Sequence, residues 1–413
     1  MTTRRRAADR VRHALSLRAA VIGLLAGCEP SVDEREAMLR APEDAWRILL
    51  TCECCALPLA ARLRQHALLS ALPDATQRRI AAAELAELQR VLAARSTLEA
   101  LDHACASLGI SLIVLKGGAI AAERRKQPLD LGDVDALVEE RDAAALWARL
   151  DARGWRRSSG GPIYEVPLRV DANHFEALVP PCEGLPLELH TGLDYRPQSD
   201  DDPSPRTRPL EGYQTLRRLV GDRAFVTTLR HSVVKHPHRR GHLRDLAMLA
   251  EALGECGGEI EGIERQLESD PMAPELMAMC AQARGMSAGQ RTVDDPDTRR
   301  FVAWKYAAFA QPAGILGRLP GWAGLNYLPL ERKPTRRSEL ARQFRYAVGP
   351  VPHTSPFAAL GQRSADATRE STPVVGARSL SRVLRVAYRL TLLTTLVLAS
   401  RDIRRRIEAM SRS

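Results

Sequence analysis

IVLKGGAIAAERRKQPLDLGDVDALV, residues 113–138, carries the most informative sequence pattern in this chain. Its second half places Asp133 and Asp135 at the start of a short apolar run that ends at Val138. Strand side chains alternate between two faces, so carboxylates two positions apart project from the same face. Such a pair can hold divalent cations against a triphosphate, because hard cations take oxygen ligands.

The first half of the stretch predicts a strand that breaks into Lys116, Gly117 and Gly118 before a helix. A strand, a glycine pair and a helix in this order expose backbone N–H groups that can bind phosphate. The two glycines leave room for the backbone to approach the phosphates, and Lys116 supplies positive charge. Lysine is rare in this chain, where most basic residues are arginine. Together the two halves predict phosphate chemistry.

A third segment, PLELH at residues 186–190, predicts another strand. Alternation places Glu188 and His190 on one face and the two leucines on the other. Glu188 is therefore a candidate third carboxylate beside the aspartate pair, and His190 is a candidate partner of a metal ligand or of a phosphate. The alternative is that Glu188 is simply solvated on the outer face of an edge strand.

These segments resemble known proteins. LKGGAIAAERR (115–125), GDVDALV (132–138) and PLELH resemble the minimal nucleotidyltransferases of the DNA polymerase β superfamily. More narrowly, they are similar to the bacterial family of uncharacterised nucleotidyltransferases. The pattern of that family is a leucine–lysine–glycine turn, an Asp-x-Asp pair and a strand that ends in histidine. Residues 229–245 resemble the helical segment of the same family.

The resemblance implies an enzyme that moves a nucleoside monophosphate from an NTP, ATP by expectation, to a hydroxyl acceptor that the sequence does not identify. It implies two Mg²⁺ (or Mn²⁺) ions bound by Asp133 and Asp135, with Glu188 completing the set and also able to deprotonate the attacking hydroxyl. It further implies that Arg244 meets phosphate and that Asp245 orients the phosphate or the base.

One position departs from the family pattern. The family usually has an arginine four residues before the first aspartate, where this chain has Leu129, and the next residue is an added acid, Asp130. A lost cation beside an extra anion would weaken phosphate binding. An alternative function is therefore a catalytically impaired module of the same fold that binds or regulates.

The fold class expected is α/β (α+β), a small mixed sheet of nucleotidyltransferase type flanked by helical segments at both ends. Five regions follow from composition and periodicity: an N-terminal helical region (1–109), the nucleotidyltransferase core (110–195), a helical domain over the site (196–285), a linker-like, partly irregular stretch (286–377) and an amphipathic basic helix (378–413).

Within these regions the sequence predicts particular elements. Strands are expected at 110–115, 134–138, 163–170, 173–179 and 185–190, and helices at 118–125 and 142–153. Residues 196–210 are expected to be a loop, residues 213–254 helical, and 301–310 a short helix. The segment 75–108 is expected to be a helix capped by Asp74, with an apolar face that includes Ile80, Leu85, Leu88, Val91 and Leu92.

Positive charge is concentrated at the two ends of the chain. The net charge is +10, and residues 1–20 and 377–413 are both rich in arginine, so the body between them is nearly neutral. Aromatic residues make up only 4% of the chain, which argues against base stacking, and nucleic acid is an unlikely partner. The basic amphipathic helix at 378–413 instead indicates a packing helix or peripheral contact with a membrane surface.

The cysteines and histidines of the chain bear on its cellular location and on a possible zinc site. The eight cysteines show no paired framework, and no secretory signal precedes them, so a cytoplasmic location is expected. The cluster CECC at 52–55 is interpreted as buried thiols on a helix, because no second ligand pair follows at metal-site spacing. A cluster of four histidines, His231, His236, His238 and His242, could bind zinc, but polar helix ends facing a cleft are favoured.

Overall fold

The computed structural model describes residues 3–123, 129–157, 177–193, 206–235, 239–256, 260–268, 270, 273–291, 294 and 296–309. All of them belong to one compact unit, formed by Met1–Ser158 and Glu176–Ala313. The predicted strand at 163–170 and the basic helix at 378–413 lie outside the described residues. So does the stretch 310–377 of the linker-like region. Among the described residues, no helix is long and apolar enough to cross a membrane.

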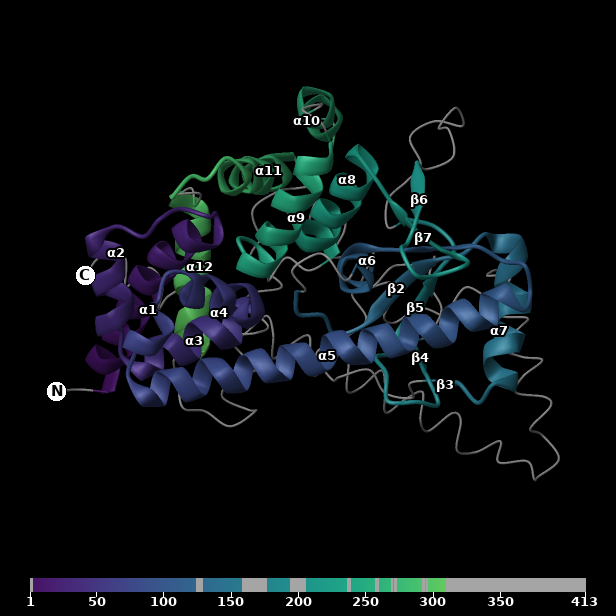
Figure 1. Cartoon of the computed structure of the whole chain (residues 1–413). Helices are drawn as coiled ribbons and strands as arrows, with labels where there is room; N and C mark the ends of the chain where they lie inside the picture. Colours follow the sequence, from purple (N-terminus) through teal and green to yellow (C-terminus); the bar gives the residue numbers. More distant parts are fainter. Residues whose placement is uncertain are drawn as a thin grey trace, which may run out of the picture. The chain divides into compact units, whose positions relative to one another are not determined.

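The mixed α/β fold class is confirmed, with helices at the N-terminus as predicted (Figure 1). The first helix begins at residue 3. The second helix starts at a capping box, in which the side chains of Ser31 and Glu34 each accept a hydrogen bond from the other's backbone N–H. The elements before the sheet are α1 Thr3–Leu25, α2 Val32–Arg40, α3 Glu43–Glu53, α4 Ala56–Gln65, the 3₁₀ turn η1 Leu69–Ala71 and α5 Asp74–Ala106.

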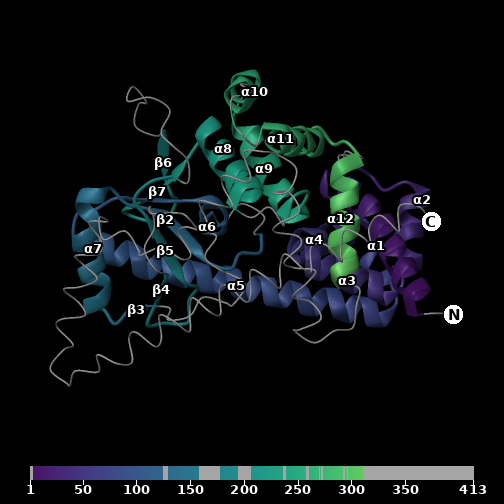
Figure 2. The same ribbon diagram turned by 180° about the vertical axis from the view of Figure 1, so that it is seen from behind.

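Helix α5 connects this helical region to the sheet. Its 33 residues extend for roughly 50 Å, and it packs against α3 and α4 at one end and against α6, α7 and β2 at the other (Figures 1 and 2). The prediction that Asp74 caps this helix is wrong. Pro73 occupies the cap position and Asp74 is the first helical residue, where its charge still favours the helix N-terminus.

The apolar face predicted for α5 is only half correct. Ile80 and Val91 are fully buried, but Leu85, Leu88 and Leu92 are 56%, 38% and 53% exposed. The periodicity correctly predicted the helix. However, the face of α5 that packs against its neighbours includes Ile80 and Val91 but not the three leucines. Periodicity reports which residues share a face and not which face meets the core.

A buried carboxylate on α5 holds the start of α4. The Glu87 side chain accepts hydrogen bonds of 2.8 Å from the backbone N–H groups of Ala56 and of Leu57. Both donors belong to the first turn of α4, whose N–H groups have no partner within the helix. Burial raises the pKa of Glu87 to about 7, against the lowering effect of these two bonds.

We expect Glu87 to make stability depend on pH. Its folded-state pKa lies above the usual 4.5, so the folded protein binds this proton more tightly than the unfolded chain. Its stabilising contribution, roughly 3 kcal/mol at most, is complete below pH 4.5 and is lost as the pH rises through 7. Melting temperatures at pH 5 and pH 8 should therefore differ more for wild type than for Glu87→Gln. A matched change at exposed Glu99 on the same helix should leave the wild-type difference unchanged, and equal pH dependence in all three proteins would contradict the prediction.

Within the described residues the sheet contains seven strands in the order β3-β4-β5-β2-β1-β7-β6. Strands β1 and β2 are antiparallel, while β2 pairs in parallel with β5 and β1 pairs in parallel with β7. The strands are β1 Leu112–Val114, β2 Val134–Leu137, β3 Arg156–Arg157, β4 Leu178–Val179, β5 Leu187–His190, β6 Thr207–Pro209 and β7 Leu216–Leu219. Helices α6 Lys116–Ala122 and α7 Glu140–Ala152 follow β1 and β2, close to their predicted places.

Two predictions about the chain after residue 195 are wrong. Residues 216–219, expected to be helical, form β7, and residues 207–209 of the expected loop form β6 at the edge of the sheet. The sequence pattern did not predict β7 because Arg218 makes this segment polar. In the structure Arg218 is nevertheless buried in β7, where it pairs with Glu123 and Glu255. Of the strand expected at 173–179, only Leu178–Val179 is a strand among the described residues.

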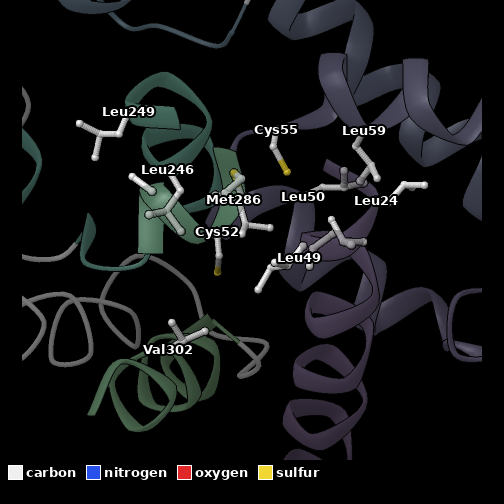
Figure 3. Packing of buried hydrophobic residues seen from close by; sticks show 14 of the residues in the cluster. Leu24, Leu49, Leu50, Cys52, Cys55, Leu59, Leu246, Leu249, Met286 and Val302 are labelled. Atoms are coloured by element: carbon white, nitrogen blue, oxygen red, sulfur yellow. The ribbon is translucent and has the colours of Figure 1, made fainter. Parts of the chain in front are cut away.

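Beyond the sheet the chain is helical again. α8 Asp222–Arg230 continues into a π-helical turn, η2 His231–Lys235, and is followed by α9 Leu243–Glu255, α10 Ile260–Glu268, α11 Ala273–Ser287 and α12 Pro296–Phe309. The last of these confirms the helix predicted near 301–310. These helices share one hydrophobic core with α1, α3 and α4, to which Leu49, Leu246 and Val302 contribute (Figure 3).

The thiols of the CECC cluster belong largely to this core. Cys52 and Cys55 are buried among its leucines (Figure 3), and Cys54 is half-buried at the C-terminal cap of α3, in a left-handed conformation. Burial raises the pKa of the Cys54 thiol to about 11. These thiols are therefore protonated at neutral pH, which fits the interpretation as packed side chains.

Buried charges join the helical region to the start of α9. Glu53, fully buried at the end of α3, accepts a 2.8 Å hydrogen bond from the backbone N–H of Leu243 and lies 3.1 Å from Arg18 and 3.3 Å from Lys305. Arg18 donates to the carbonyl of Gly241 at 2.5 Å. Gly241 has φ +65°, and a Cβ there would lie 2.6 Å from the Thr298 side chain. The turn that precedes α9 is thus fixed by hydrogen bonds to Glu53 and Arg18 and by close packing against Thr298.

Candidate active site

Asp135 and Glu188 are neighbours across the parallel pair β2–β5. They are 6% and 5% exposed, and β5 lies between β4 and β2 and not at the edge of the sheet. The alternative in which Glu188 is solvated on an edge strand is therefore wrong. Parallel strands covered on both faces bury polar side chains only where these have partners or a function.

His190 joins this carboxylate pair from two positions further along β5. Its Nε2 lies 2.8 Å from Asp135 Oδ1, and its side chain is almost completely buried. Ligand atoms of Asp135, Glu188 and His190 all lie within 4.8 Å of one another, which suits a single divalent cation. The side-chain alternation predicted from PLELH is confirmed, and the structure makes His190 either a ligand itself or the residue that orients Asp135.

Asp133 lies just before β2, in a bend, and is half-buried. It does not belong to the three-residue group, but it is close enough to feel the charges of the other carboxylates. Burial, then Asp135, then Glu188 raise the pKa of Asp133 to about 6, while Lys116 and Arg239 oppose the rise. An excess of negative charge on this scale is what a bound divalent cation would offset.

Lys116 reaches the same carboxylates from the turn after β1. Its Nζ lies 3.2 Å from Asp135 Oδ1 and 2.7 Å from Nδ1 of His231. Its backbone is in the left-handed region, with φ +52°, which is unusual for a residue with a side chain, and strained residues of this kind cluster at functional sites. Helix α6 begins at this lysine, two residues earlier than the sequence pattern indicated.

The two glycines after Lys116 lie in the first turn of α6. A Cβ on Gly118 would lie 3.1 Å from a methyl group of Val114 and 3.6 Å from one of Val134, so its missing side chain lets α6 pack closely on β1 and β2. A Cβ on Gly117 would make only ordinary contacts. The phosphate-binding role of both residues remains a prediction, to which the structure adds a packing reason for Gly118.

Arg244 and Asp245 are buried at the start of α9 and bind each other. Arg244 donates to Asp245 at 2.9 Å and to the backbone carbonyl of Asp130 at 3.2 Å. Burial alone would raise the pKa of Asp245, but Arg244 and Arg239 hold it below its usual value. The pair fastens α9 to the segment that leads into β2. Contact of either residue with nucleotide remains a prediction.

The residues that depart from the family pattern have partners of their own. Leu129 is buried in a small apolar cluster with Ile120 and Met248. Asp130 forms an ion pair with Arg90, which comes from α5. The added carboxylate therefore has a nearby cation of its own, so it does not simply add negative charge to the metal-binding group.

Sequence reasoning named His231 only as one of four histidines expected at polar helix ends facing a cleft, and it did not name Arg239. His231, at the start of the π-helical turn, contacts Lys116, and Arg239 contributes positive charge next to Asp133 and Asp245. Both lie in the histidine-rich segment, whose composition was the available signal. Of the four histidines considered for zinc, His236 and His238 lie outside the described residues, while His231 and His242 do not belong to the metal-binding group found in the described part of the chain.

A mixed sheet that gathers Asp135, Glu188 and His190 beside a lysine–glycine turn defines a nucleotidyltransferase-like protein. The chain belongs to the family described as uncharacterised nucleotidyltransferase, whose model matches residues 55–268, just over half of the sequence. The match begins at α4 and includes the whole sheet and α8 to α10. Neither the curated proteins nor the solved structures provide a match.

Proposed function

We propose that this protein transfers a nucleoside monophosphate from a nucleoside triphosphate, with ATP as the expected donor, to a hydroxyl acceptor and releases pyrophosphate. The convergence of Asp135, Glu188 and His190 inside the sheet is the observation that carries this proposal. Membership of a nucleotidyltransferase family supports the general reaction. Bound Mg²⁺ or Mn²⁺ would neutralise the triphosphate and favour in-line attack at its α-phosphorus.

The three carboxylates divide two roles between them in this proposal, metal binding and proton acceptance. Asp133 and Asp135 hold the cation, and Glu188, directly across from Asp135, completes the set and accepts the proton of the attacking hydroxyl. His190 fixes the orientation of the Asp135 carboxylate through their 2.8 Å contact. The donor set consists mainly of carboxylate oxygens, which fits Mg²⁺ and Mn²⁺.

The remaining residues bind the nucleotide in this proposal. Lys116 supplies its ammonium group to the phosphates, and the backbone at Gly117 and Gly118 approaches them. Arg244 meets the phosphates, and Asp245 orients the phosphate or the base. The hydrogen bonds of Arg244 to Asp245 and to the Asp130 carbonyl support this by holding α9 against the segment that enters β2.

Metal-dependent stabilisation by nucleotides tests the proposal. A ligand that binds only the folded state raises the melting temperature, so each NTP with Mg²⁺ or Mn²⁺ should stabilise the protein more than either component alone. Incubation of the protein with α-phosphate-labelled NTPs, metal and a cell extract should then label an acceptor. Absence of metal-dependent stabilisation with every NTP would contradict the proposal.

The same experiment separates the competing function. Metal-dependent binding of NTPs without a labelled acceptor would favour a binding or regulatory module, which the departure at Leu129 and Asp130 first suggested. The Arg90 partner of Asp130 and the apolar packing of Leu129 weigh against that alternative. Peripheral membrane contact through 378–413 stays a prediction.

A further inference from the structure

The ammonium group of Lys116 lies beside the Asp135 carboxylate of the candidate metal site. Its distance of 3.2 Å from Asp135 Oδ1 makes it a direct partner of the carboxylate that also contacts His190. The Lys116 side chain is almost completely buried, so this contact is only weakly screened by solvent. An ammonium group and a divalent cation that share one carboxylate oxygen repel each other strongly at such distances.

His231 is the second partner of this ammonium group. A lysine ammonium can only donate hydrogen bonds, so Nδ1 of His231, 2.7 Å away, must accept from it. Nδ1 of His231 then offers its lone pair to Lys116 from the π-helical turn His231–Lys235. Single π-helical turns are often found at functional sites. The separation of 115 positions between these partners explains why the sequence did not connect them.

We propose that Lys116 is a resident cation that competes with a divalent cation for Asp135, and that His231 is a positioning residue for it. When a divalent cation and a triphosphate bind, Lys116 gives up Asp135 but keeps His231, which holds the ammonium group beside the phosphates. This inference rests on the proposed function. It adds that metal alone must compete with Lys116, whereas metal with nucleotide does not, because the phosphates offer the displaced ammonium group new partners.

Opposite changes in two affinities test this inference. Lys116→Met should bind Mn²⁺ alone about tenfold more tightly than wild type, because the competing charge is gone. The same variant should bind Mn²⁺ with a non-hydrolysable ATP analogue about tenfold more weakly, because a phosphate partner is lost. Titration of free Mn²⁺ by electron paramagnetic resonance and calorimetry with the analogue measure the two affinities without turnover.

Variants of His231 test the positioning role. His231→Ala should weaken binding of the Mn²⁺–analogue complex several-fold, while His231→Asn, whose amide oxygen can accept near the position of Nδ1, should retain most of it. His103→Ala, at an exposed position on α5, is the matched control and should behave as wild type. A general structural role for His231 would lower the melting temperature of both variants without separating their nucleotide affinities, which would overturn the positioning role.

The outcomes distinguish this inference from the proposed function. Unchanged or weaker binding of Mn²⁺ alone to Lys116→Met would overturn the resident-cation inference even if the wild type transfers nucleotides. Tighter Mn²⁺ binding to Lys116→Met, in a protein that binds no nucleotide, would support the resident cation while contradicting the proposed function.

Discussion

Asp135→Asn is expected to reduce nucleotidyl transfer by at least about a thousandfold, or about 4 kcal/mol of transition-state stabilisation. Asp135 lies at the centre of the site. Glu188 lies opposite it on the neighbouring strand, and both His190 and Lys116 contact its Oδ1. An asparagine keeps the size of the side chain and one acceptor oxygen, so the sheet should form normally. It removes the negative charge that would hold the cation.

The loss should also be visible without turnover. Metal-dependent stabilisation by NTPs should disappear in Asp135→Asn, while the melting temperature without ligand stays within a few degrees of wild type. Glu139→Gln, an exposed change just beyond β2, is the matched control and should retain both stabilisation and transfer. Full activity of Asp135→Asn on an identified acceptor would refute the assignment of this site.

Glu53→Gln is expected to have the largest effect on stability, a loss of about 3 kcal/mol or more. The change preserves shape but removes a fully buried charge that faces Arg18 and Lys305. Breaking a buried ion pair from one side is costly because the remaining charges stay buried without compensation. The hydrogen bond from the Leu243 N–H to the carboxylate is weakened as well.

Thermal or urea unfolding measures this loss, and two comparisons locate its cause. Glu43→Gln, on the same helix but in an exposed pair with Arg79, should cost less than about 1 kcal/mol. The double variant Glu53→Gln/Lys305→Met should recover part of the stability, because it removes one of the uncompensated cations. A cost for Glu53→Gln no larger than that for Glu43→Gln would show that the buried charges do not stabilise the fold.

The local order of residues in the site could be predicted from the sequence. Period-two alternation within β5 correctly put Glu188 and His190 on one side, and the break in the apolar run correctly placed Lys116 at the junction between β1 and α6. These features depend only on the geometry of a strand and on the residues within it. The N-terminal helices and α12 were predictable for the same reason, since helical periodicity is also a local property.

The tertiary structure alone decided which distant residues meet. The contacts of Lys116 with His231, of Asp130 with Arg90 and of Leu243 with Glu53 join residues 40 to 190 positions apart. Strand β7 was missed because Arg218 makes its sequence polar, and only its distant partners Glu123 and Glu255 make its burial favourable. A sequence pattern shows which side chains share a face, but a buried charge is stable only where the path of the chain brings a partner to it.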